Sequence, residues 1–326
     1  MQCRFLITVV LFAVSLAAHQ AFGQTDRYPS RPVRMVIPFA PGGASDFIGR
    51  ILQIKLAEAL GQQVVIDNRP GASGGIGVET AATATPDGYT LLLGNVSAMG
   101  IGPSLFSAIR KNEGNLIPVT LVVDVPGALG ISAALPPNNL KEFIAYAKAN
   151  EGKLSYGSAG YASAQRMAFE FFMSKAGIKM LHVPYKGGAG ASTIATITGE
   201  VAATMVTTAS LVPFARSGKI KILAVVAKKR IPALPDTPTM IELGFPELDL
   251  GSWQGIYVPR GTPKAIVDRL YKVTVKVVHD PWTVEQYGKA SAQPITSASP
   301  ADFAKFMREQ VAFWGKITSD LHIKVQ

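Results

Sequence analysis

A glycine-rich segment near the start of the chain, residues 38–46 (PFAPGGASD), follows a short apolar run. Glycine lets backbone N–H groups approach a ligand closely, and a helix that begins here would add the positive end of its dipole. Such an arrangement binds a carboxylate. The candidate ligand-binding residues are Phe39, Ala40, Gly42, Gly43, Ser45 and Asp46. A tight turn capped by Ser45 or Asp46 is an equally good interpretation, and a helix cap and an anion site can share one helix end.

Residues 158–163 (SAGYAS) repeat this pattern later in the chain, again between a predicted strand and a predicted helix. Two opposed helix N-termini would clamp one anion. The candidate residues of this second loop are Ser158, Gly160, Ala162 and Ser163. A third glycine-rich turn, residues 185–192, lacks the terminal Gly-Lys-Ser/Thr order of a phosphate loop, which argues against nucleotide binding.

Residues 71–75 (GASGG) fit the G-x-S-x-G pattern of a serine hydrolase, with Ser73 as the nucleophile and three histidines further along the chain. Pro70 and Gly71 favour an irregular loop over the one sharp turn that holds a hydrolase nucleophile. A secreted serine hydrolase therefore stays an alternative, and the main interpretation is a protein that is not an enzyme. The spacing of histidines and carboxylates favours neither a metal site nor a cofactor.

The elements that must hold these loops alternate between strand and helix. Residues 33–39 alternate in hydropathy, and the stripe of Ile48, Leu52, Leu56 and Leu60 then predicts a helix that ends at Gly61. Further strands are expected at 64–66, 90–93, 121–123, 154–156, 180–183, 201–206, 220–226 and 256–258. Further helices are expected at 77–84, 140–149, 164–172, 191–198 and 211–217, after residue 263 and from residue 299. This alternation predicts an α/β fold with largely parallel sheets flanked by helices, and ligands at the carboxyl ends of strands.

The N-terminus has the features of a cleavable export signal. Arg4 precedes the apolar run 5–18, and the small residues Ala21 and Gly23 favour cleavage after residue 23. Cys3, the single cysteine, would be removed with this segment, and the mature protein would be periplasmic. The run is short for a membrane span, although a retained anchor helix is the alternative.

The mature chain is basic, because removal of Arg4 leaves 31 lysines and arginines against 22 aspartates and glutamates, a net charge of +9. These residues are spread along the chain, and aromatic residues do not alternate with them as in nucleic-acid-binding surfaces. We therefore expect no nucleic-acid partner. Attraction of a small acid is consistent with the surplus.

Six short segments, read together, resemble one protein family in their order along the chain. They are residues 28–34 (YPSRPVR), 38–46 (PFAPGGASD), 68–72 (NRPGA), 86–91 (PDGYTL), 182–187 (HVPYKG) and 234–239 (LPDTPT). Trp253, residues 261–263 and the last predicted helix agree as well. The chain thus resembles the Bug receptors, the extracytoplasmic solute-binding proteins of tripartite tricarboxylate transporters, over nearly all of its mature length.

The resemblance implies a two-lobed type II periplasmic-binding-protein fold that closes on a ligand. It implies one lobe from residues 24–124 and 229–326, and a second from residues 125–228. The family pattern assigns the ligand carboxylate to the loop that matches 39–46, faced by the loop that matches 158–163. It also implies cleft contacts at Ser97, Thr207 and Thr208.

Two departures from the family pattern limit what can be transferred. This chain has Arg166 where relatives commonly have a histidine, and Val201-Ala202 where they often have an aspartate. Arg166 could pair with a second carboxylate of the ligand, or it could face solvent in the first turn of a helix.

The function expected is capture of a small organic acid for the membrane subunits of a transporter. A sensor that signals through a partner protein is the alternative to transport, and a monomer is the expected state.

Overall fold

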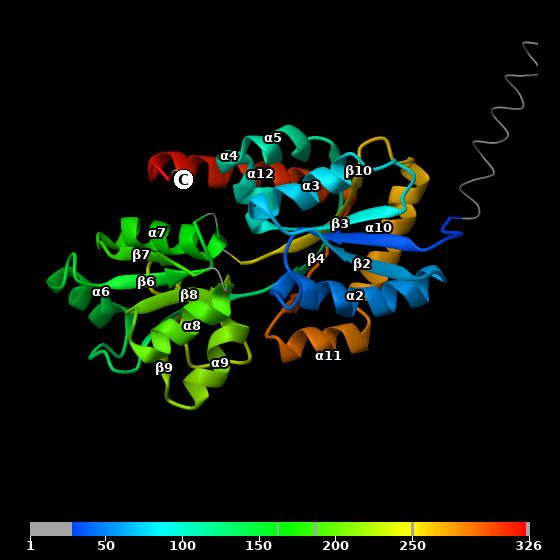
Figure 1. The fold of residues 1–326 in the computed structure, drawn as a ribbon. Coiled ribbons are helices and arrows are strands. Elements are labelled where there is room, and N and C mark those ends of the chain that lie inside the picture. Colours follow the sequence, from blue (N-terminus) through cyan, green and yellow to red (C-terminus); the bar gives the residue numbers. More distant parts are fainter. Residues whose placement is uncertain (1–27, 162, 186–187, 249–250, 324–326) are drawn as a thin grey trace, which may run out of the picture.

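The computed structural model of the chain describes residues 28–161, 163–185, 188–248 and 251–323. The predicted signal peptide and Ala162 lie outside these residues. Strands in the described part form two separate sheets, each between layers of helices (Figure 1). The chain passes from the first sheet to the second and back again.

The first sheet has six strands in the order β11-β4-β10-β3-β1-β2. These strands are β1 (Val33–Ile37), β2 (Val64–Asn68), β3 (Thr90–Asn95), β4 (Leu116–Asp124), β10 (Gln254–Pro259) and β11 (Gln293–Pro294). Strands β2 and β3 pair with β1 in parallel, whereas β10 runs antiparallel to both β3 and β4. Four of the five residues of β1 are buried, as expected for a strand covered on both faces.

The second sheet has five strands in the order β7-β6-β8-β5-β9. They are β5 (Gly127–Ser132), β6 (Ser155–Ser158), β7 (Leu181–Pro184), β8 (Ala203–Thr207) and β9 (Ile220–Val226). Strand β6 pairs in parallel with β7 and β8, and β5 runs antiparallel to β8 and β9. The expected parallel pairing therefore holds for the βαβ units. The strands next to the two crossings, β4, β5, β9 and β10, contribute antiparallel pairs, so both sheets are mixed.

Helices cover both faces of each sheet. The helical segments are α2 (Ala44–Leu60), η1 (Ala72–Gly74), α3 (Gly75–Ala82), η2 (Val96–Ile101), α4 (Gly102–Leu105), α5 (Ser107–Glu113), α6 (Leu140–Ala149), α7 (Ala164–Ala176), α8 (Gly188–Thr198), α9 (Thr208–Arg216), α10 (Lys264–Val278), α11 (Pro281–Lys289) and α12 (Pro300–Asp320). Helices α2, α10 and α11 pack on one face of the first sheet, and α3, α5, η2 and α12 on the other. Helices α6 and α7 cover one face of the second sheet, and α8 and α9 the other.

Two connections join the sheets. Strand β4 ends at Asp124 and β5 begins at Gly127, with two residues between them, while the segment between β9 and β10 leads back. A third link is a packing contact: the C-terminal part of α12 reaches α7, where the rings of Phe313 and Phe171 lie 6.3 Å apart (Figure 1). No helix within the described residues combines the length and the apolar character needed to cross a bilayer.

Candidate ligand-binding cleft

The loop between β1 and α2 is held in shape by Asp46, a buried residue in the first turn of α2. Its Oδ2 accepts hydrogen bonds from the Gly42 backbone N–H and from Nε of Arg50, both at 2.9 Å. Asn68 donates from Nδ2 to Asp46 Oδ1 at 3.2 Å and to the Phe39 carbonyl at 3.0 Å. Burial raises the pKa of Asp46, but the hydrogen bonds that it accepts, first that from Arg50, outweigh burial and lower it. Asp46 is therefore ionised at neutral pH, with its charge satisfied inside the protein.

The end of β3 is tied both to this loop and to the second sheet. Oδ1 of Asn95 accepts from the Ala98 backbone N–H at 3.0 Å and caps η2, while its Nδ2 donates to Ser45 Oγ at 3.1 Å. The Oγ of Ser97 accepts a hydrogen bond from the backbone N–H of Ala164 at 3.3 Å. Ala164 is the first residue of α7, so Ser97 connects the two halves of the molecule directly.

The second predicted loop is organised by two serines. Ser158 is buried at the end of β6, and its Oγ lies 2.7 Å from His182 Nε2. The same oxygen donates to the Gly160 carbonyl at 3.1 Å and accepts from the Gly160 N–H at 3.2 Å. Ser163 caps α7, because its Oγ accepts from the Arg166 N–H at 3.2 Å. Gly160 has φ = +123°, a conformation that side chains with a Cβ rarely adopt, which explains the glycine at this turn.

Arg166 supports this loop from behind. Its Nη1 donates to the Tyr161 carbonyl at 3.0 Å, and its Nε lies 3.5 Å from Glu170 Oε1. The Arg166 side chain is only 14% exposed. It therefore does not face solvent, and its hydrogen bonds go to groups of the protein itself.

Only the first threonine of the pair at the end of β8 faces the cleft. Thr207 is the N-cap residue of α9, and its Oγ1 lies 3.2 Å from Ser210 Oγ. Thr208 is fully buried, and its Oγ1 has no hydrogen-bond partner among the described residues.

These loops surround a cleft with a volume of about 650 Å³. From the predicted set, the lining includes Phe39, Ala40, Gly42, Gly43, Ser45, Ser97, Gly160, Ser163 and Thr207. The other lining residues are Pro41, Ala44, Ser73, Asn95, Ala159, Tyr161, Gln165, Gly188, Ala189, Ser252 and Gln254. Of the remaining predicted residues, Asp46, Ser158, Arg166 and Thr208 lie behind the cleft wall, and Ala162 lies outside the described residues.

The described lining of the cleft contains no lysine, arginine, histidine, aspartate or glutamate. Its polar character comes from hydroxyl and amide side chains and from the starts of helices. Helices α2, η2, α7, α8 and α9 all begin at this space. The starts of α2 and α9 have no side-chain cap. Free N–H groups and the positive dipole end at such a helix start stabilise an anion without a cationic side chain. The arrangement therefore suits a small anion.

Within the described residues, His, Cys, Asp and Glu form no group of three or more that could hold a metal ion.

A family model described as "Tripartite tricarboxylate transporter family receptor" matches residues 48–323. The chain belongs to this family. A curated relative from Bordetella pertussis, "Protein BugT", is 32% identical to this receptor over 323 residues, 98% of the chain and 98% of the relative.

Solved structures resemble this receptor over nearly their whole length. The periplasmic binding protein BugD is 35% identical, with a TM-score of 0.80, and the match covers 92% of this chain and 100% of BugD. The structure of Rpa4515 from R. palustris with adipate is 30% identical, with a TM-score of 0.82, over 91% and 99% of the two chains. The Bug-type resemblance and the two-lobed α/β fold predicted for this receptor are confirmed.

Ser73 lines the cleft of the receptor without the partners of a catalytic nucleophile. It lies in the single turn η1 with left-handed backbone angles, φ 53° and ψ 33°. The histidine side-chain hydrogen bonds in the described part of the chain go elsewhere, from His182 to Ser158 and from His279 to Thr296. Neither of these hydrogen bonds supplies Ser73 with the histidine base that a serine nucleophile uses.

Some lining residues carried a signal that sequence reasoning left unused. Gly188 and Ala189 belong to the third glycine-rich turn, and Asn95 directly follows an expected strand. Ser252 precedes strand β10 and Gln254 is its first residue, so neither follows a strand. Because β10 runs antiparallel to its neighbours, its beginning lies at the edge where the parallel strands end.

Proposed function

We propose that this receptor captures a small carboxylate in the cleft and delivers it to the membrane subunits of a tripartite tricarboxylate-type transporter. The observation that carries this proposal is a cleft with no charged side chain in its described lining, at which five helices begin. A carboxylate gains charge-assisted hydrogen bonds from N–H and hydroxyl groups in such a site. The adipate in the Rpa4515 structure supports the same ligand class.

Capture works, in this proposal, by closure of two lobes on the acid. The sequence division gives a first lobe of residues 24–124 and 229–326 and a second lobe of residues 125–228. The separation of the strands into two sheets supports two lobes. Met240 and Leu248 pack in the core of the second sheet, so we extend the second lobe as far as Leu248. The hydrogen bond between Ser97 and Ala164 then marks a point where the closed lobes touch. Loops at helix starts supply the carboxylate contacts, and the distal part of the cleft supplies specificity.

We place the protein in the periplasm as a monomer, after cleavage of the signal peptide behind residue 23. The periplasmic binding protein BugD, similar over 92% of this chain, supports the location. A sensor that signals through a partner protein would use the same cleft, and removal of the transporter subunits separates the two roles. A transport receptor loses its effect on uptake, whereas a sensor keeps its effect on gene expression.

A thermal-shift screen of residues 24–326 tests ligand capture. The screen compares mono-, di- and tricarboxylates, each beside its uncharged amide. A ligand that binds only the folded protein at a hundred times its Kd stabilises it by about 2.7 kcal/mol. We expect the melting temperature to rise with one class of acids and to stay constant with the matching amides.

The result that contradicts the proposal is a folded, ligand-free protein whose melting temperature responds to no acid, or responds equally to acid and amide. The Ser73→Ala variant covers the hydrolase alternative. We expect it to bind acids like the wild type, and turnover of an ester by the wild type that this variant lacks would instead identify an enzyme.

A further inference from the structure

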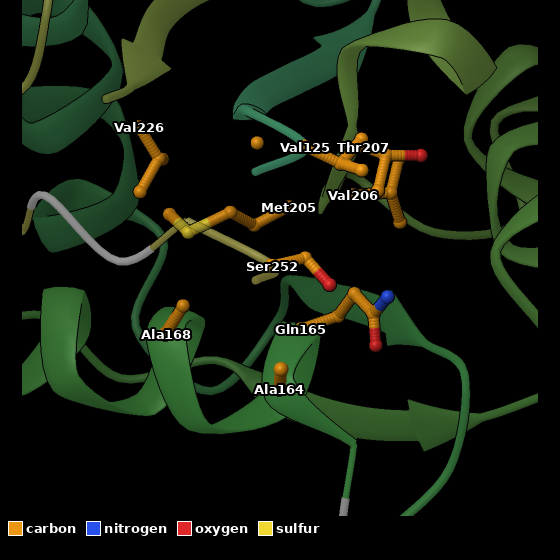
Figure 2. Close-up of a pocket in the computed structure, with 10 residues that line it drawn as sticks. Val125, Ala164, Gln165, Ala168, Met205, Val206, Thr207, Val226 and Ser252 are labelled. Carbon is orange, nitrogen blue, oxygen red and sulfur yellow. The ribbon is translucent and has the colours of Figure 1, made fainter. Parts of the chain in front are cut away.

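A second, much smaller cavity lies beside the cleft, at the junction of the two sheets (Figure 2). Its volume is about 30 Å³. It is lined by Val125, Gly127, Ala164, Gln165, Ala168, Met205, Val206, Thr207, Val226 and Ser252. These residues come from β5, α7, β8, β9 and the two connections between the sheets.

The cavity adjoins the cleft through three shared residues, Gln165, Thr207 and Ser252, which line both spaces. In Figure 2 the polar ends of these three side chains lie on one side of the cavity, and Val226 lies on the opposite side. Met205 extends between Val226 and Ser252. The cavity is therefore polar where it meets the cleft and apolar in its interior.

Apolar side chains make water a poor occupant of the interior. A buried water usually needs two to four polar partners, whereas a cavity lined by apolar side chains stays dry or takes an apolar ligand. The size sets a further limit. A cavity of roughly 150 Å³ holds benzene, so a space of about 30 Å³ admits a methyl or methylene group and excludes an aromatic ring.

We propose that this recess receives the hydrocarbon end of the ligand, so that the preferred acid is an aliphatic monocarboxylate that ends in a methyl group. The inference rests on the proposed function, because the carboxylate must be held at the helix starts of the cleft. A second carboxylate at that end of the ligand would enter the apolar recess and lose its hydration without compensation.

Small residues keep the recess open. Gly127, Ala164 and Ala168 form part of its wall, and Met205 limits its depth. A Cβ on Gly127 would lie 3.4 Å from Val226 Cβ and 3.6 Å from the Val206 carbonyl oxygen, which are ordinary contacts. Gly127→Ala therefore fits the fold and narrows the recess, and Met205→Ala deepens it.

The experiment measures Kd by calorimetry for two matched series, the n-alkanoates from acetate to octanoate and the α,ω-dioates of the same chain lengths. In the wild type we expect an optimum among the alkanoates that binds tighter than the dioate of equal length. Gly127→Ala should weaken binding of this alkanoate about fourfold, the factor that corresponds to ~0.8 kcal/mol for one buried methylene. Gly127→Ala should change the Kd of acetate less than twofold. Met205→Ala should move the optimum of the alkanoate series to a longer chain.

Gly288→Ala in α11 is the matched control, because a Cβ there meets no atom within 4 Å. It should leave both series unchanged. The inference is overturned if the dioate binds tighter at every length, or if Gly127→Ala weakens all acids equally, as expected when the recess is only a packing void. If no acid of either series binds to folded protein, the proposed function itself fails, which is a different result.

Discussion

Asp46 shows how a charged residue can serve an anion site without facing the anion. Its carboxylate pairs with Arg50 at 2.9 Å and accepts the N–H of Gly42. The charge that could repel a bound acid is thus neutralised within the protein, while the loop backbone keeps its shape. We interpret Asp46 as a residue that positions the loop.

Asp46→Asn should lower the free energy of unfolding by about 1–2 kcal/mol at neutral pH, because hydrogen bonds to a charged group are lost. Asp46 has a lowered pKa in the folded protein. Its contribution is therefore present above the ordinary aspartate pKa and is lost as the pH falls through the folded value. Urea unfolding at about pH 7 and about pH 3 measures this contribution. The difference in unfolding free energy between the wild type and Asp46→Asn should be smaller at the lower pH. A difference that is equal at both pH values would show that the charge is not its source.

His182 should make stability depend on pH in a different range. Burial, and secondarily the charge of Arg166, lower the pKa of His182 from 6.5 to about 4. Between these values the unfolded chain binds a proton that the folded protein does not, so stability falls as the pH decreases from 6.5 towards 4.

His182→Gln keeps a hydrogen-bond donor for Ser158 and removes this titration. Between pH 6.5 and pH 4, the free energy of unfolding of the wild type should fall by roughly 2 kcal/mol more than that of His182→Gln. His279→Gln is the same change at an exposed position and serves as the control for the substitution itself. Parallel slopes for wild type and His182→Gln would refute the assignment.

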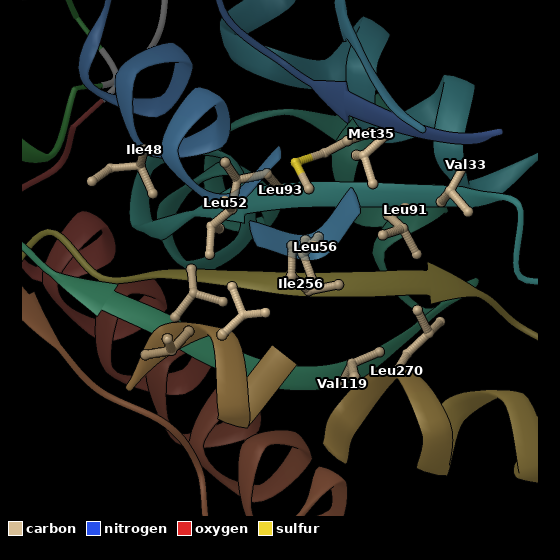
Figure 3. Packing of buried hydrophobic residues seen from close by; sticks show 14 of the residues in the cluster. Val33, Met35, Ile48, Leu52, Leu56, Leu91, Leu93, Val119, Ile256 and Leu270 are labelled. Carbon is tan, nitrogen blue, oxygen red and sulfur yellow. The ribbon is translucent and has the colours of Figure 1, made fainter. Parts of the chain in front are cut away.

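At the scale of elements, α2 carries both the cleft and the core. Its first turn borders the cleft, and its apolar stripe packs on the first sheet. Leu52 and Leu56 point towards Leu93 and Ile256 (Figure 3), and Ile48 belongs to the same core cluster. The core therefore fixes the direction in which the N–H groups of the first turn point.

Leu52→Ala should lower the unfolding free energy by about 2–5 kcal/mol, because Leu52 is fully buried and its truncation leaves a cavity. Ile54→Ala is the matched change on the outer face of the same helix, where the side chain is 48% exposed. Its effect should stay within about 0.5 kcal/mol. Denaturant unfolding of both variants is the measurement, and equal losses would contradict the orientation of α2.

The elements that sequence analysis predicted are those whose periodicity is local. The apolar spacing that begins at Ile48 and the capping serine Ser299 mark real helices, α2 and α12. Strand β5 was not expected, because its sequence GALGIS has two glycines and little alternation, and it forms through pairing with β8 and β9 on both sides. Likewise, the loops at 39–46 and 158–163 could be assigned to one cleft, but the sequence could not show that Arg166 turns back towards Tyr161.

At the scale of the whole molecule, two crossings, the hydrogen bond between Ser97 and Ala164, and a contact between α12 and α7 connect the halves. The crossings alone would let the lobes rotate about the links near Val125 and Ser252, which exchange backbone hydrogen bonds with each other. The ring of Phe313 on α12 meets Phe171 on α7 edge to face, with an interplanar angle of 77°. This contact stabilises the relative orientation of the two halves that the structure shows.

Phe313→Ala should weaken acid binding about two- to tenfold. An aromatic pair contributes about 0.5–1.5 kcal/mol beyond area burial, and the closed state of the variant would lack this contribution. Small-angle scattering should show a larger radius of gyration for the ligand-free variant. Phe306→Ala is the control, since Phe306 packs on Trp253 and Phe303 within the first half. Equal effects of the two variants on Kd would argue against a role of α12 in closure.

The uncharged cleft has a consequence for the thermodynamics of capture. None of the described residues that line it is a histidine, aspartate, glutamate, lysine or arginine. Binding of an acid that is already ionised should therefore move no proton between protein and solvent. Calorimetric heats should agree in buffers with different ionisation enthalpies, and Kd should stay constant between about pH 6 and pH 8; proton uptake would reveal a titrating group at the ligand. The occupancy of such a receptor follows the concentration of its acid and not the acidity of the medium.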